Sequence, residues 1–261
     1  MKRLAHRYLL NVNHKRGGIT GFYRRLSAAI ASLSFNDREW EALIIEWYRV
    51  KHWQDPAYIA DTLFDWEQLS ISTYFPRAPA SILVLAAGKG RELRALQMQG
   101  YSVFGVEMDP ECLEVARRTT SPIGLLGTIQ ASFLDIAEST CDLPEMTFEG
   151  IIIGWGALTH LSSNKMAVRL FRRLSEQYPG TPIVMSRAPV PKIKGLHRFL
   201  SVVHAIKFGS FYRSFHGHYG PLAYVTVNDL EKLLRTLNYS VLTRSQGAEY
   251  PHLVVRSHEE R

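Results

Sequence analysis

The sequence predicts an α/β fold with a doubly wound, mostly parallel sheet, and its clearest signal lies near the middle of the first half. Residues 82–85, Ile-Leu-Val-Leu, form an apolar run short enough for a strand buried on both faces. A glycine-bearing turn at 88–92 follows, then leucines at helical spacing, and Gly100 stands where a helix C-cap glycine belongs. A second strand, 103–106, ends in an acid, Glu107.

This unit of strand, turn, helix, strand and acid is suited to a nucleoside cofactor. Gly88 and Gly90 let the backbone approach a ligand with no Cβ in the way. The first helical N–H groups face the turn. The carboxylate of Glu107, at the tip of the second strand, can accept both hydroxyls of a ribose, as in dinucleotide folds. We therefore expect a cofactor site at the carboxyl edge of the sheet.

The spacing disfavours a nicotinamide cofactor. That fingerprint needs a third small residue three positions after the second glycine, and Leu93 stands there. Because leucine would obstruct close packing of helix on strand, a nicotinamide oxidoreductase is the weaker alternative.

The stretch instead resembles motifs I and II of class I (Rossmann-like) S-adenosylmethionine (SAM) methyltransferases. Residues 85–92, Leu-Ala-Ala-Gly-Lys-Gly-Arg-Glu, match the variant with Gly-x-Gly-Arg-Glu, and residues 106–110, Val-Glu-Met-Asp-Pro, match the Gly-Val-acid-x-x-Pro element. The resemblance implies that Glu107 holds the ribose of SAM. Ala86 replaces the usual acid of motif I, which in the family helps to order the loop and the methionine end of SAM.

The resemblance also implies which other residues meet S-adenosyl-L-methionine. In the family, an acid after the third strand accepts from the adenine amino group, and Ser132 falls near that place, with Phe133 able to stack on adenine. The loop after the fourth strand lies against the sulfonium, which implicates Trp155. The predicted cofactor-binding residues are Ala86, Gly88, Gly90, Arg91, Glu107, Met108, Ser132, Phe133 and Trp155.

His160, in the same loop, is the predicted catalytic residue. Many relatives carry a histidine there, and an unperturbed pKa near ~6.5 suits removal of a proton from a hydroxyl or an amine. The alternative is a structural histidine bonded to the backbone.

We expect a helical N-terminal cap over residues 1–78 and a methyltransferase domain over 79–258. In the cap, Asn36 and Glu39 predict a capping box, and Asp55 followed by Pro56 predicts a further helix. Its many aromatic residues indicate a packed core or an aromatic lid. The methyltransferase domain is predicted to have seven strands, of which the last two form a closing antiparallel hairpin. The strands after the first two lie near 127–131, 148–154, 182–186, 240–244 and 252–255. Helices are predicted over 164–178 and from Thr226.

Residues 187–225 are predicted to be an inserted lid over the methyl acceptor. The insertion is basic and aromatic, and its predicted substrate-binding residues are Arg198, Arg213 and Tyr219, the arginines being suited to a carboxylate or phosphate. A membrane-surface helix and a groove for single-stranded RNA fit the same composition. His216 and His218 have no third ligand at a recognisable spacing, so we predict no metal site.

The net charge of +7 is unevenly spread. Residues 1–36 contain seven Lys or Arg and no acid, and residues 177–228 contain six and no acid. Such segments indicate an anionic partner, although neither carries an RNA-binding motif, which disfavours nucleic acid. The two cysteines have neither metal nor redox spacing, and no apolar run approaches the ~20 residues of a membrane span. We therefore predict a cytoplasmic protein.

These observations predict a methyltransferase that moves the methyl group of SAM to O or N of a small anionic or aromatic molecule. Two alternatives stay open. One is a non-catalytic SAM-binding scaffold, in which Ala86 and Ser132 mark a decayed site. The other is an RNA methyltransferase.

Overall fold

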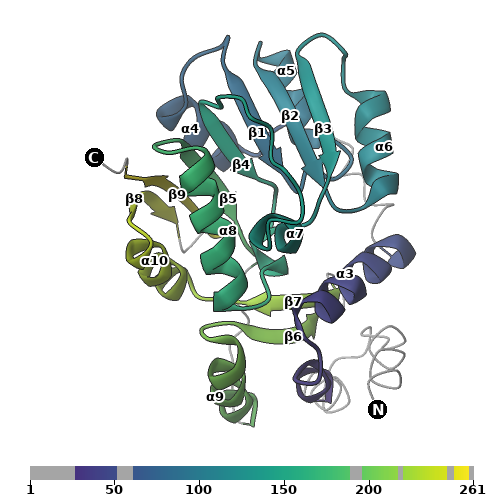
Figure 1. The fold of residues 1–261 in the computed structure, drawn as a ribbon, viewed down its shortest axis with the longest axis vertical. Helices are drawn as coiled ribbons and strands as arrows, with labels where there is room; N and C mark the ends of the chain where they lie inside the picture. The colour runs from purple at the N-terminus through teal and green to yellow at the C-terminus, as the bar shows by residue number, and fades with distance from the viewer. Residues whose placement is uncertain (1–26, 52–60, 189–195, 217–219, 246–249, 259–261) are drawn as a thin grey trace.

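A seven-stranded sheet with helices on both faces organises the molecule (Figure 1). The computed structural model describes residues 27–51, 61–188, 196–216, 220–245 and 250–258. The strand order is β3-β2-β1-β4-β5-β9-β8, in which β9 runs antiparallel to β5 and β8 and the other neighbours are parallel. This confirms the predicted doubly wound sheet with its C-terminal hairpin. The strands are β1 (Ser81–Leu85), β2 (Ser102–Glu107), β3 (Leu125–Gln130), β4 (Gly150–Ile153), β5 (Pro182–Ser186), β8 (Tyr239–Ser245) and β9 (His252–Ser257).

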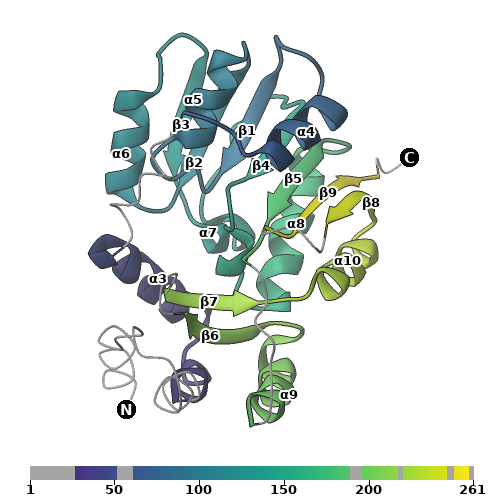
Figure 2. The same ribbon diagram turned by 180° about the vertical axis from the view of Figure 1, so that it is seen from behind.

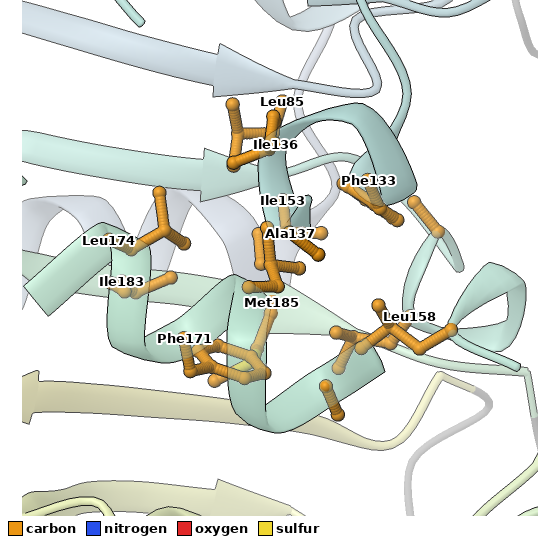
Figure 3. Packing of buried hydrophobic residues seen from close by; sticks show 14 of the residues in the cluster. Leu85, Phe133, Ile136, Ala137, Ile153, Leu158, Phe171, Leu174, Ile183 and Met185 are labelled. Atoms are coloured by element: carbon orange, nitrogen blue, oxygen red, sulfur yellow. The ribbon is translucent and has the colours of Figure 1, made fainter. Parts of the chain in front are cut away.

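Strand β1 shows why the predicted strands are apolar at nearly every position. Leu83 and Leu85 pack into the core cluster formed with the helices of one face, while Ile82 and Val84 pack into the cluster of the other. Burying one such side chain contributes roughly 1.5–3 kcal/mol. Figure 3 shows the first cluster, where side chains of the strands meet those of α7 and α8. That face carries α7 (Phe133–Ala137), α8 (Asn164–Gln177) and α10 (Val227–Thr236), and the opposite face carries α4 (Asp65–Tyr74), α5 (Arg91–Met98) and α6 (Pro110–Thr119) (Figures 1 and 2).

The helices before the sheet begin partly where the sequence predicts. Helix α3 (Asp37–Lys51) starts at the predicted capping box, in which the Glu39 N–H donates to Asn36 Oδ1 (2.8 Å) and the Asn36 N–H donates to Glu39 Oε2 (2.9 Å). The start predicted at Asp55 lies outside the described residues. Residues 61–64 are not helical, and α4 begins at Asp65 because the Glu67 carboxylate accepts from the N–H of the preceding residue 64.

The insertion lies beyond the carboxyl ends of the parallel strands, next to α3 (Figure 1). It contains α9 (Leu196–Phe208) and a two-stranded sheet of β6 (Tyr212–His216) and β7 (Gly220–Tyr224). Gly220 has a φ of +73°, and a Cβ there would lie 2.2 Å from the Trp47 ring of α3. Glycine is therefore required for α3 to seat on β7. Among the described residues, no helix is long and apolar enough to cross a membrane.

Candidate functional site at the carboxyl edge of the sheet

A cavity of about 780 Å³, named here the edge cavity, lies beside the ends of β1, β2 and β4. Open α/β sheets bind their ligands in this position. The predicted His160 lines it, as does every predicted cofactor-binding residue except Gly90. It is also lined by residues that the sequence did not single out, namely Tyr48, Ala87, Lys89, Glu92, Val106, Ala131 and Ala157.

The glycine turn brings the backbone into left-handed conformations at the cavity wall. Gly88 has a φ of +54° and lines the edge cavity. Ala86 has a φ of +55°, which costs a non-glycine residue about 1–2 kcal/mol. Gly90 has a different use: a Cβ there would lie 3.1 Å from Ala116 Cβ on α6. Gly90 thus permits helix packing and is not part of the wall, contrary to its predicted contact with the cofactor.

The sequence predicts that Leu93 obstructs close packing of α5 on β2, and the structure shows that this prediction is wrong. The structure supplies the small residue from the strand instead, because a Cβ on Gly105 would lie 3.0 Å from Leu93 Cδ1. The spacing argument against a nicotinamide site therefore loses its steric reason, and the choice of cofactor depends on the side chains of the cavity.

Glu107 is held rigidly at the tip of β2. Its Oε2 accepts from the Gly88 N–H (2.8 Å) and its Oε1 from the Asp109 N–H (2.9 Å), and the residue is 4% exposed. Burial raises the pKa of Glu107 to about 7, against the opposing effect of these two N–H groups. Each carboxylate oxygen has a second lone pair, so the oriented side chain can still accept from two hydroxyl groups.

Arg91 fastens the turn to helix α4. Its guanidinium donates to Glu67 and Glu92 (each 2.7 Å by Nη2) and lies 4.4 Å from the centre of the Phe64 ring. Nη1 also donates to the Thr62 carbonyl (2.9 Å). Arg91 lines the edge cavity as predicted, but protein groups occupy these donors.

Glu92 is a buried charged residue of this wall that the sequence did not predict. It is 4% exposed, and its Oε1 accepts from Arg91 and from the Trp155 N–H (3.2 Å). Glu67, Glu92 and Arg91 together bury two carboxylates with one guanidinium, a formal charge of −1. Burial raises the pKa of Glu67, and the negative charge of Glu92 raises it further. The signal was the acid of the Gly-x-Gly-Arg-Glu motif itself.

Ser132 and Phe133, which follow β3, also line the edge cavity. Ser132 is the N-cap of α7, since its Oγ accepts from the Asp135 N–H (3.0 Å). The Asp135 carboxylate pairs with Arg38 of α3 through Oδ1 (2.7 Å) and accepts from the Ser132 hydroxyl through Oδ2 (2.8 Å). The acid near this position thus serves the helix cap and an ion pair, and the hydrogen of the Ser132 hydroxyl is donated to it.

His160 is paired with a tyrosine from the N-terminal helix. The Tyr48 hydroxyl of α3 lies 3.0 Å from His160 Nε2, and both side chains line the edge cavity. His160 lies in η2 (Leu158–His160), directly after β4. The helical cap therefore contributes a side chain to the site, which the aromatic density of the cap indicated without identifying the residue.

Arg213 has a structural position that differs from its predicted contact with the acceptor. It is fully buried, forms an ion pair with Asp37 and donates to the carbonyls of Phe35 (2.9 Å) and Ser162 (3.0 Å). Its guanidinium stacks 3.7 Å from the centre of the Phe208 ring. It therefore joins the insertion to the N-terminal helix and lies outside the edge cavity. The Arg198 side chain and Tyr219 lie outside what the structure describes.

Comparison with known proteins finds matches among solved structures only. No family model matches the chain, and no curated protein matches its sequence. A SAM-dependent methyltransferase from Methanosarcina mazei is 15% identical with a TM-score of 0.58, over 76% of this chain and all of that one. The CcbJ methyltransferase from Streptomyces caelestis is 16% identical with a TM-score of 0.53, over 74% of this chain and 88% of that one.

A third match is the glycopeptide N-methyltransferase MtfA, solved with SAM bound, at 13% identity and a TM-score of 0.52, over 73% of this chain and 92% of that one. The fold is therefore that of class I, Rossmann-like SAM-dependent methyltransferases. At these identities the likeness concerns the fold, and the chemistry must be argued from the residues of this chain.

Proposed function

We propose that this protein is a SAM-dependent methyltransferase that methylates O or N of a small molecule. The observation that carries the proposal is the edge cavity, where Glu107 stands at the end of β2 beside the Gly88 turn, in the fold of known SAM-dependent methyltransferases.

The donor set of the cavity fits SAM. The Glu107 carboxylate suits the two ribose hydroxyls, Phe133 offers a ring to the base, and Ser132 Oγ, whose hydrogen is donated to Asp135, could still accept from the base. The net negative charge of Glu67, Glu92 and Arg91 suits a cationic group, so Glu92 would take the role that the acid absent at Ala86 has in the family. SAM supplies an electrophilic methyl group on a sulfonium.

His160 and Tyr48 would handle the proton of the acceptor. A neutral imidazole can take the proton that an acceptor hydroxyl or amine loses on methylation. The bond from the Tyr48 hydroxyl fixes the orientation of the His160 ring. Trp155 and Phe133 would exclude water from the reacting groups.

The alternatives fit the site less well. A decayed scaffold would not need a second buried carboxylate at the cavity wall, since Glu67 and Glu92 share the one guanidinium of Arg91 and an excess of buried negative charge is destabilising. An RNA methyltransferase would use the basic insertion, yet Arg213 is fully buried and paired with Asp37.

Calorimetric titration with S-adenosylhomocysteine (SAH) tests the proposal, with NAD as the control. We expect micromolar binding of SAH and none of NAD. A folded protein that binds no SAH, or binds NAD instead, contradicts the proposal.

A further inference from the structure

A second, smaller cavity adjoins the edge cavity. Tyr48 and Trp155 line both, so these two side chains form the shared wall. The remaining described walls are Gly156 and Thr159 from the loop after β4, Ala188 after β5, Leu222 of β7 and Tyr250 before β9. The second cavity therefore connects the insertion with the edge of the sheet that carries the predicted cofactor site.

The walls of the second cavity are aromatic and aliphatic. Among the described residues that line it, none is charged. Trp155 and Tyr250 meet edge to face, with ring centres 4.9 Å apart at 82°, and form a corner into which a flat molecule can stack. The Thr159 hydroxyl already donates to the Gly156 carbonyl (2.5 Å). Stacking and dispersion thus dominate what these walls offer a ligand.

One polar group of the second cavity marks its junction with the edge cavity. Tyr48 lines both cavities, and its hydroxyl lies 3.0 Å from Nε2 of His160, a lining residue of the edge cavity. A ligand stacked on Trp155 and Tyr250 would direct a hydroxyl or amine towards this pair.

Arg187 directly precedes Ala188 of the cavity wall, and it is not one of the described lining residues. It is 8% exposed, and its Nη1 donates to the Ala188 carbonyl (3.0 Å). No carboxylate of the described residues pairs with it, and burial lowers its pKa. It could receive an anionic substituent only if the wall at Ala188 opened.

We propose that the second cavity is the acceptor site and that it takes a planar, uncharged aromatic molecule with a hydroxyl or amine, in place of the anionic acceptor favoured by the charge of the sequence. This proposal rests on the proposed function, because it assigns the cofactor to the edge cavity. It also makes Tyr48 a residue that contacts the acceptor.

Two matched probes test the class of acceptor on protein saturated with SAH. Equilibrium dialysis would compare 2-naphthol with 6-hydroxy-2-naphthoate, which adds only a carboxylate. We expect 2-naphthol to bind at least about tenfold more tightly, because the carboxylate would be desolvated without a partner. Tighter binding of the anion would contradict the proposal and favour a site that opens to Arg187. Binding of neither probe to SAH-bound protein would overturn the proposal.

A series at Ala188 tests the location, because Ala188 lines the second cavity and not the edge cavity. Ala188→Leu should lower 2-naphthol affinity by at least about tenfold, Ala188→Val by less, and the isosteric Ala188→Ser should leave it unchanged. SAH affinity should stay within about twofold throughout, which also reports correct folding. If the Ala188→Leu variant does not fold, the 2-naphthol affinity of the Ala188→Val variant still tests the location of the acceptor site. Unchanged 2-naphthol affinity in a variant that binds SAH would overturn the acceptor site alone, whereas absence of SAH binding in the unmodified protein would overturn the proposed function.

Discussion

The two cavities at the carboxyl edge of the sheet are built in different ways. The edge cavity takes much of its wall from one continuous stretch, residues 86–108, in which the turn, the first residues of α5 and the end of β2 follow each other. The second cavity takes one to three residues from each of several distant segments, between Tyr48 and Tyr250. A short stretch of sequence can therefore encode the first, and only the folded chain can assemble the second.

The contrast extends to how each cavity is supported. The edge cavity is braced by buried charge, with Arg91 between Glu67 and Glu92, whereas the second cavity is braced by aromatic contacts such as Trp155 with Tyr250. Buried charges are sensitive to the loss of one partner. Apolar walls tolerate changes that preserve volume. Substitutions should therefore act on the edge cavity through charge and on the second cavity through shape.

The largest effect should come from Arg91→Met. It leaves the carboxylates of Glu67 and Glu92 buried without their cation, so the free energy of unfolding should fall by about 3–5 kcal/mol in urea denaturation. Arg235→Met is the matched control, since the exposed pair of Arg235 with Glu231 should contribute at most about 0.5 kcal/mol. Equal losses in both variants would show that the buried cluster is not a special support of the site.

Glu107 offers a sharper test of the edge cavity, through both affinity and pH. Glu107→Gln should weaken SAH binding by about 1–3 kcal/mol, the scale for hydrogen bonds to a charged group, while the exposed Glu111→Gln should change nothing. Because the pKa of Glu107 is raised to about 7, SAH affinity of the unmodified protein should fall as the pH drops below about 7. Calorimetry at several pH values in the unmodified protein and in Glu107→Gln checks this. If the SAH affinity of Glu107→Gln still fell below about pH 7, the titrating group would be another residue.

The same pKa shift has the opposite consequence for stability without ligand. A carboxyl whose pKa is raised in the folded state stabilises the fold fully below its unfolded pKa of about 4.5, and this contribution is lost as the pH rises through about 7. As the pH rises from about 4.5 to about 7, the unfolding free energy of the unmodified protein should therefore fall relative to that of Glu107→Gln. Acidic conditions thus favour the empty fold and disfavour the complex.

The sequence predicted what local patterns determine. The positions along the chain of the strands in the large sheet, the capping box of Asn36 and the place of Glu107 follow from hydrophobic periodicity, caps and a contiguous motif. The partners of the charged residues could not be predicted, because they come from distant parts of the chain. Arg213 was assigned to a ligand, yet its ion-pair partner is Asp37, in a helix that precedes the sheet. Arg91 lines the edge cavity as predicted, but its ion pair with Glu67 of α4 could not be predicted for the same reason.

A rescue experiment compares the two acids that could serve the methionine end of SAM. Glu92→Gln should weaken SAH binding by about tenfold, the scale of one charged hydrogen bond. Adding Ala86→Asp should restore part of the loss, because aspartate tolerates the left-handed φ of +55° better than most residues. Calorimetry of both variants measures this. A Glu92→Gln protein with full affinity would remove Glu92 from the site, and failure of rescue alone would limit the conclusion to Glu92.

The smallest effect should come from Tyr48→Phe, which acts where the two cavities meet. Loss of the bond to His160 should lower the free energy of unfolding by about 0.5–1.5 kcal/mol and 2-naphthol affinity by a few fold, with SAH affinity unchanged. Tyr74→Phe is the control: it also removes a tyrosine hydroxyl bond, to Thr243 (2.5 Å), and Tyr74 lines neither cavity. Both variants should lose similar stability, and Tyr48→Phe alone should lose 2-naphthol affinity. If Tyr74→Phe lost it equally, the effect would come from the fold as a whole, and Tyr48 would not contact the acceptor.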